Sequence, residues 1–165
     1  MKTFEAVIAE LRFRQDCRFE SATTLPQIPV DFALPADLAQ FYGQFSEARL
    51  FSDDGYDPRC HILPPQKFVQ VGSAICGEPT ELAPERSWYS LAHVRDGNFI
   101  GIDLSPTRLG WCYDCFHETY GEPGYCKVIA RSFTELLNQL LISKNEAFWL
   151  SKDFRGYGDA YDFFN

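Results

Sequence analysis

The sequence lacks a run of apolar residues long enough to cross a bilayer, which takes about 20 residues. Its opening residues, Met1 to Ala6, are followed by mixed charge rather than by the apolar stretch of a signal peptide. The six cysteines in 165 residues are irregularly spaced, so they do not indicate the disulfide framework of a secreted protein. These absences predict a cytoplasmic protein that does not bind a membrane.

Positive charge is also scarce. Lys and Arg number 15 against 23 Asp and Glu, which gives a formal net charge of −8. Binding to DNA, to an RNA backbone or to anionic lipid depends on a basic field, so this balance disfavours nucleic acid as a partner. An acidic surface suits a basic protein partner, although the same charge can simply keep a protein in solution.

Signatures of catalysis are missing as well. The sequence contains no GxSxG or HExxH motif and no glycine-rich loop that would cradle a phosphate. Its three histidines, His61, His93 and His117, lie in or beside predicted strands, where a histidine is more often structural than a general base. We therefore predict a protein that is not an enzyme and uses no cofactor.

One cysteine motif, Cys112-Tyr113-Asp114-Cys115 with His117 two residues on, invites comparison with metal sites. Zinc needs about four N or S ligands, and a CxxC hook must point both sulfurs the same way. On a strand, positions 112 and 115 face opposite sides of the sheet, and no second CxxC or HxxxH occurs. Buried thiols that pack as small apolar groups are the favoured interpretation. A metal or thiol enzyme built on these residues is the weaker alternative.

Aromatic residues, by contrast, are abundant. They make up 16% of the chain, with 15 Phe against a single Met, and predict a core rich in rings. A chain of 165 residues fits a single domain, 1–165, with one core. Apolar residues at helical spacing predict helices over residues 4–11, 34–45 and 133–141, the last opened by the capping-box pattern of Ser132 and Glu135, and a short final helix at 147–150.

Segments of strand-like composition lie between these helices. Short turns join predicted strands at 88–94, 99–104, 111–118 and 125–130, which makes them antiparallel, because a parallel crossover needs a longer connection. Further strands are predicted at 48–51 and 60–63, residues 17–32 should be extended, and 66–71 is either a short helix or an edge strand. The order predicts an α+β domain, a mainly antiparallel sheet with flanking helices packed on one face.

Side chains alternate along a strand, so each strand should present one face to the helices and one more open face. An open face that pairs aromatic and acidic groups suits a binding surface, although an ordinary solvated face is the alternative. The acidic turn around Gly55 adds further candidates, as partner contacts or as turn formers. We predict that partner-binding residues are Asp53, Asp54, Asp57, Asp103, Tyr113 and Asp114. The aromatic extension 151–165 should wrap the edge of the domain.

The order of four short segments resembles that of a known family. The segments are Leu34 to Leu38 followed by Phe41-Tyr42, then Ile62 to Pro64, Phe99 to Asp103 and Val128 to Leu137. In order and spacing, over roughly residues 34–141, they resemble the Smi/Knr-like branch of the SUKH superfamily. The resemblance implies an α+β fold with a mixed or antiparallel sheet flanked by helices, and no catalytic residues. The sequence departs from the pattern at Gln44 to Glu47, where the family often has an Asn-Gly turn, and in the extension.

The resemblance also implies a function. Bacterial members include immunity proteins that bind and neutralise a cognate toxin, often a nuclease, and fungal members regulate cell-wall synthesis through protein interactions. We therefore expect a protein-binding domain, and the acidic charge adds the expectation that the partner is a basic toxin domain. A regulatory interaction module without a toxin is the main alternative.

Overall fold

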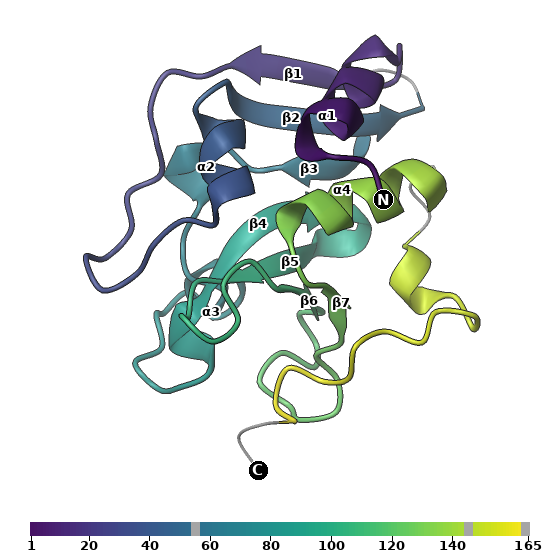
Figure 1. Ribbon diagram of the computed structural model, residues 1–165. Helices are drawn as coiled ribbons and strands as arrows, with labels where there is room; N and C mark the ends of the chain where they lie inside the picture. The colour runs from purple at the N-terminus through teal and green to yellow at the C-terminus, as the bar shows by residue number, and fades with distance from the viewer. Residues whose placement is uncertain (54–56, 144–146, 163–165) are drawn as a thin grey trace.

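The fold is built on one antiparallel sheet, seen in a computed structural model that describes residues 1–53, 57–143 and 147–162 (Figure 1). Neighbours in the sheet are neighbours in the chain, and every pairing between named strands is antiparallel. The predicted α+β class is confirmed. The strands of the described residues are β1 (Arg18–Ser21), β2 (Phe45–Ser52), β3 (Pro58–Ile62), β4 (Trp88–Val94), β5 (Asn98–Asp103), β6 (Cys112–Cys115) and β7 (Val128–Ala130).

Three helices cover one face of the sheet, which we call the helical face: α1 (Phe4–Phe13), α2 (Ala36–Tyr42) and α4 (Phe133–Ser143) (Figure 1). Their ends are fixed by polar side chains. The Ser132 hydroxyl accepts from the backbone N–H of Glu135 at 3.0 Å, as the capping-box pattern predicts. Asp37 at the start of α2 accepts from the backbone N–H of Thr134 at 2.7 Å, so one carboxylate joins the beginnings of α2 and α4.

The core of the helical face is rich in rings, as the composition predicts. Phe41 lies at its centre, with ring centroids 5.4 Å from Phe133 and 5.5 Å from Phe45. The buried Tyr42 donates its hydroxyl hydrogen to the carbonyl of Leu63 at 2.7 Å, which satisfies the polar end of the ring. The stripe that predicted the first helix is buried along its whole length: Phe4, Val7, Ile8 and Leu11.

The opposite face carries a second core, which the sequence analysis did not anticipate. Trp88 lies at its centre, with its ring centroid 4.9 Å from that of Tyr113 and 5.3 Å from that of Tyr161. The short helix α3 (Val71–Cys76) adds Val71 to this core. The prediction that all helices pack on one face is therefore wrong, and so is the prediction of an open face around Tyr113.

Several element boundaries differ from the predicted ones. β1 falls within the segment expected only to be extended, and its mostly exposed residues show no apolar alternation that would reveal a strand. β6 and β7 are shorter than predicted, because the chain leaves the sheet after Cys115 and turns at Gly121 and Gly124, both with positive φ. The ambiguous stretch contains the end of the single turn η1 (Pro65–Lys67) and an isolated bridge between Gln70 and Tyr89. Three further single turns are η2 (Glu85–Ser87), η3 (Arg95–Gly97) and η4 (Phe148–Leu150).

The described part of the extension, residues 151–162, covers the β7 edge of the sheet, as predicted, and residues 163–165 lie outside the described residues. Val128 donates its N–H to the carbonyl of Gly158 at 2.9 Å, and the N–H of Ala160 bonds to the carbonyl of Cys126 at 2.8 Å. The extension thus pairs with backbone groups that an edge strand would otherwise leave open.

Candidate functional site

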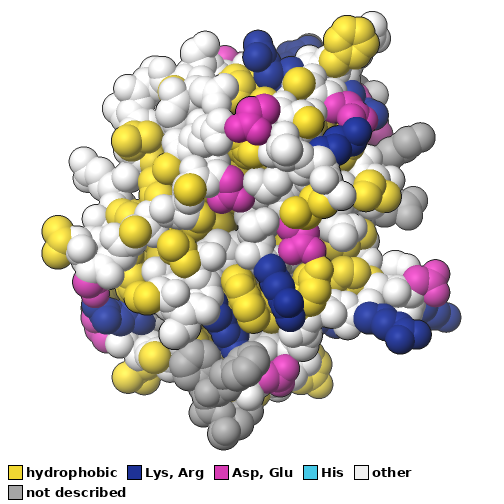
Figure 2. Space-filling view, viewed as in Figure 1, with side chains coloured by type: hydrophobic (Ala, Val, Ile, Leu, Met, Phe, Trp, Pro, Cys, Tyr) yellow, Lys and Arg dark blue, Asp and Glu magenta, His cyan; other side chains and the backbone are white. Residues whose placement is uncertain are grey.

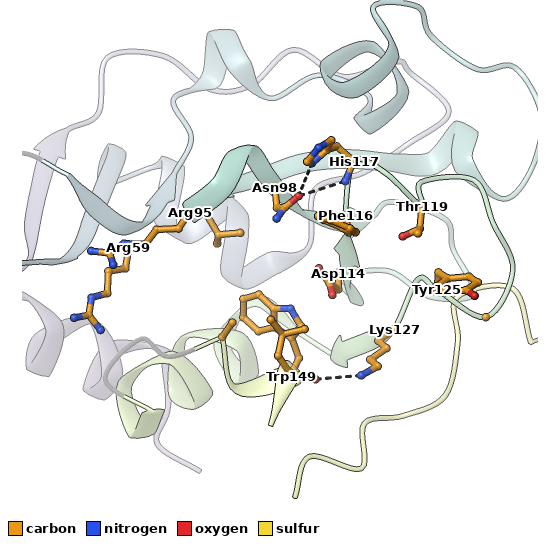
Figure 3. A pocket seen from close by; sticks show the side chains of 14 residues that line it. Arg59, Arg95, Asn98, Asp114, Phe116, His117, Thr119, Tyr125, Lys127 and Trp149 are labelled. Atoms are coloured by element: carbon orange, nitrogen blue, oxygen red, sulfur yellow. Dashed lines mark hydrogen bonds between the residues drawn. The ribbon is translucent and has the colours of Figure 1, made fainter. Parts of the chain in front are cut away.

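A pocket of about 1010 Å³ opens at one end of the sheet, where β3 begins, β4 ends, β5 begins and β6 ends (Figure 3). Strand alternation along β6 directs Asp114 to the helical face, the side on which Cys112 lies, while Tyr113 and Cys115 point to the opposite face. The turn η4 brings Trp149 across from Asp114 and closes the pocket from the other side (Figure 3).

Asp114 is the acid of this pocket. Its backbone N–H bonds to the carbonyl of Lys127 at 3.0 Å, which fixes the end of β6 against the segment before β7. Burial raises the pKa of the Asp114 carboxyl to about 6, while the nearby Lys127 ammonium and a hydrogen bond from the Trp149 side chain act in the opposite direction. Burial wins, so this carboxylate is charged at neutral pH but takes up a proton at a pH well above the usual range.

Three cationic side chains, Arg59, Arg95 and Lys127, also line the pocket. Arg59 donates to the Asp53 carboxylate at 2.8 Å, and Arg95 donates to the same carboxylate at 2.8 Å. The hydrogen bonds from Arg59 and then from Arg95 lower the pKa of Asp53. Lys127 donates to the carbonyl of Trp149 at 3.3 Å.

A smaller hollow of about 390 Å³ adjoins the pocket and shares Val94 and Arg95 with it. Asp57 and His93 also line this hollow. The structure therefore brings three of the predicted residues, Asp53, Asp57 and Asp114, to one end of the sheet. Asp54 lies outside the described residues.

The two remaining predicted residues are buried, which corrects their expected place on an open face. Asp103 accepts from the Tyr113 hydroxyl at 2.6 Å and from the Ser87 hydroxyl at 2.8 Å, and both Asp103 and Tyr113 lie in the protein interior. α3 and the extension cover them, so neither side chain can reach a partner in this conformation. The hydrogen bond between Tyr113 and Asp103 satisfies two buried polar groups and so stabilises the second core.

Part of the face opposite the helical face is exposed, and this part lies over β2, β3 and β4. There His61 on β3 pairs with Arg49 on β2 and with His93 on β4. Its Nε2 lies 2.5 Å from a carboxylate oxygen of Glu47. Burial and then the neighbouring His61 lower the pKa of His93.

The pocket mouth also presents apolar surface. Tyr125 is 59% exposed and Leu150 is 68% exposed, and both line the pocket. Exposed apolar side chains beside a charged rim are typical of a protein interaction site. Neither these two residues nor the three cations could be singled out from the sequence, because segments distant in the chain bring them together and no periodic pattern marks them.

The cysteine motif is divided between the two cores. Cys112 lies in the core of the helical face and Cys115 in the second core, as strand alternation predicts. Within the described residues, no group of three or more His, Cys, Asp or Glu side chains is placed to hold a metal ion.

The described part of the chain also contains no helix long and apolar enough to span a membrane.

Comparison with known proteins gives two matches. The model of the SMI1 / KNR4 family (SUKH-1) matches residues 30–139. The chain is 35% identical, over 161 residues, to a protein of Bacillus subtilis (strain 168) called Immunity protein YokJ, and the match covers 97% of this chain and 96% of the relative. No solved structure gives a significant match.

Proposed function

Because the chain belongs to the SMI1 / KNR4 family (SUKH-1), we propose that it is an immunity protein, which binds a cognate toxin in the cytoplasm and neutralises it. The observation that carries this proposal is the similarity to Immunity protein YokJ along nearly the whole of both chains. The proposed action is binding without catalysis.

The end of the sheet that holds the pocket is the proposed interface. It combines exposed apolar side chains, Tyr125 and Leu150, with the charged groups of Asp53, Asp57 and Asp114. Such a mixture favours protein binding, because apolar contacts supply affinity while charged groups steer and orient the partner.

The proposed partner is a basic toxin domain, such as a nuclease. Nucleases bind phosphate and so carry basic surfaces, and a net charge of −8 would speed their encounter with this protein. Figure 2 shows charges of both signs scattered among hydrophobic side chains on the face it draws. We expect the net charge to supply the long-range attraction, and the local contacts to decide where the partner binds.

Co-expression tests the function. A toxin domain encoded beside this gene, at the end of a large secreted protein, would be produced in cells with and without this protein. We expect the protein to restore growth and to copurify with the toxin domain. A toxin that kills cells equally well in the presence of this protein would refute the proposal.

Two charge reversals of equal size test the proposed interface. Asp57→Lys changes the hollow beside the pocket, and Glu20→Lys makes the same change of charge on β1, at the other end of the sheet. We expect Asp57→Lys to slow association at low salt more than Glu20→Lys does, measured by stopped-flow or surface plasmon resonance. If both variants slowed association equally, only the net charge would matter and the proposed interface would be wrong.

A further inference from the structure

Among the described residues that line the pocket, positive side chains outnumber negative ones, although the whole protein is acidic. They comprise three cations, Arg59, Arg95 and Lys127, and one acid, Asp114, and both arginines also bond to Asp53 at the rim. We propose that the pocket binds an acidic side chain of the partner protein, whose apolar neighbours in the partner's chain pack against the aromatic walls. This inference rests on the proposed function, since it specifies which part of the partner enters the site.

Two guanidinium groups share one carboxylate at the rim. Arg59 holds Asp53 through bonds of 2.8, 3.0 and 3.2 Å, whereas the described contacts of Arg95 with Asp53 amount to one bond of 2.8 Å. The Arg59 and Arg95 side chains are 31% and 49% exposed. A guanidinium presents five N–H donors in a planar fork that matches a carboxylate. A second carboxylate can therefore bind on the pocket side without displacing Asp53.

Asp114 opposes an incoming carboxylate, but only while it is ionised. Burial in the pocket raises its pKa to about 6. The charged and titratable groups that line the pocket with it are Arg59 on β3, Arg95 in η3, His117 after β6 and Lys127 before β7. As pH falls through about 6, Asp114 loses its negative charge, so the balance of charge in the pocket becomes more positive.

The walls suit an apolar neighbour of the acidic side chain. Phe116, Tyr125 and Trp149 line the pocket together with Leu150, and Figure 3 shows Phe116 and Trp149 on opposite sides of Asp114. A volume of about 1010 Å³ is large enough for a short peptide segment rather than for one side chain alone.

A carboxylate of a protein fits this site better than a phosphate backbone does. A nucleic acid repeats its negative charge along every strand, and a protein with a net charge of −8 repels it as a whole. A single acidic side chain on a basic toxin domain meets less repulsion, because the basic groups around it on the toxin are attracted to the acidic groups of this protein.

Peptide titration followed by NMR tests the pocket without the toxin. The probes are the acetylated and amidated tripeptides Phe-Glu-Leu, Phe-Gln-Leu and Phe-Lys-Leu, added to the full chain, with the indole signal of Trp149 as a local reporter. We expect the Glu peptide to bind at least about fivefold more tightly than the Gln peptide, because charged hydrogen bonds are the stronger ones. Arg95→Gln should abolish this preference, and the matched change Arg49→Gln, on the exposed part of the opposite face, should preserve it.

Asp114→Asn sharpens the test because it predicts a gain. We expect the variant to bind the Glu peptide about threefold more tightly at pH 7.5 and to lose the rise in affinity that the natural protein shows as pH falls through about 6. A preference for the Lys peptide, weaker binding by Asp114→Asn, or no peptide binding would overturn the proposal. Displacement of the Glu peptide by oligouridine would overturn it in favour of a nucleic-acid site.

The outcomes separate this inference from the proposed function. Protection against the toxin without a preference for the Glu peptide refutes the pocket assignment alone. A clear preference for the Glu peptide in a protein that protects against no toxin refutes the immunity function alone.

Discussion

Asp103 and Asp114 lie on neighbouring strands but on opposite faces of the sheet, and their hydrogen-bond partners differ. Asp103, at the end of β5, is buried in the second core and accepts from the Ser87 hydroxyl, the Tyr113 hydroxyl and the backbone N–H of Ser105 at 2.6 to 2.8 Å. Asp114, on β6, lies in the pocket with the Trp149 side chain as a donor and the Lys127 ammonium nearby.

The difference shows that the supply of donors decides the role of a buried acid. Three short hydrogen bonds occupy the oxygens of Asp103, so its side chain serves the fold. Asp114 has fewer partners than its burial requires, which is why its pKa is raised to about 6. The pKa of such a carboxyl group should therefore respond to a charged group that enters the pocket.

Replacing Asp103 should have the largest effect on stability. Asp103→Ala removes the acceptor of three hydrogen bonds and leaves the buried Tyr113 hydroxyl without this carboxylate, although the Ser87 hydroxyl keeps the carbonyl of Pro84 at 3.0 Å. We expect the free energy of unfolding to fall by about 3 kcal/mol. Urea denaturation followed by tryptophan fluorescence measures it. A loss no greater than that of Asp114→Ala would contradict the contrast between the two faces.

Removing a single donor from the same cluster should cost less. Tyr113→Phe keeps the ring beside Trp88 and deletes only the hydroxyl, so we expect a loss of about 1 kcal/mol. In a protein that already carries Asp103→Ala, the same change should cost almost nothing. Fully additive losses would show that the hydrogen bond between the two residues contributes nothing to stability.

Asp114→Asn should stabilise the protein at neutral pH. The folded pKa of about 6 exceeds the unfolded value of 3.8, so between these values the folded state holds more protons and the stability of the natural protein falls as pH rises. Above pH 6 the variant should be more stable by about 1 kcal/mol, since part of the shift is screened by solvent. The gain should disappear near pH 4, and thermal unfolding at both pH values is the measurement. A gain of equal size at pH 4 would contradict the assignment of the shift to Asp114.

The smallest effect on stability is expected at the pocket rim. Arg95→Gln removes an exposed ion pair with Asp53, and such pairs contribute little to folding. We expect an unchanged midpoint of urea denaturation together with the loss of the preference for the Glu peptide. A large fall in stability would make this arginine a structural residue.

The helical face could be predicted from the sequence because helices carry a period. The stripe from Phe4 to Leu11 and the leucines of α4 recur at helical spacing, and both are buried as expected. The second core has no such period, since Trp88 meets Tyr161 only after the extension has returned to the sheet. Strand alternation correctly placed Cys112 and Cys115 on opposite faces, but it could not tell which face would be covered.

The candidate site was predictable only in part. Asp53, Asp57 and Asp114 were expected to contact a partner, and they do lie at one end of the sheet. Their cationic neighbours Arg59 and Arg95 were not anticipated, because the first contact depends on the pairing of β2 with β3 and the second on that of β3 with β4. Net charge describes the whole chain, whereas the described residues that line the pocket include three cations and one acid.

Both ends of the chain are needed to close its cores. The backbone N–H of Lys2 bonds to the Asn138 side chain at 2.9 Å, α1 packs on α4, and Tyr161 covers Trp88. During synthesis, an incomplete copy therefore leaves aromatic surface on both faces open to chaperones and proteases. Removal of residues 151–162 should therefore expose the ring of Trp88 and make the shortened chain prone to aggregation.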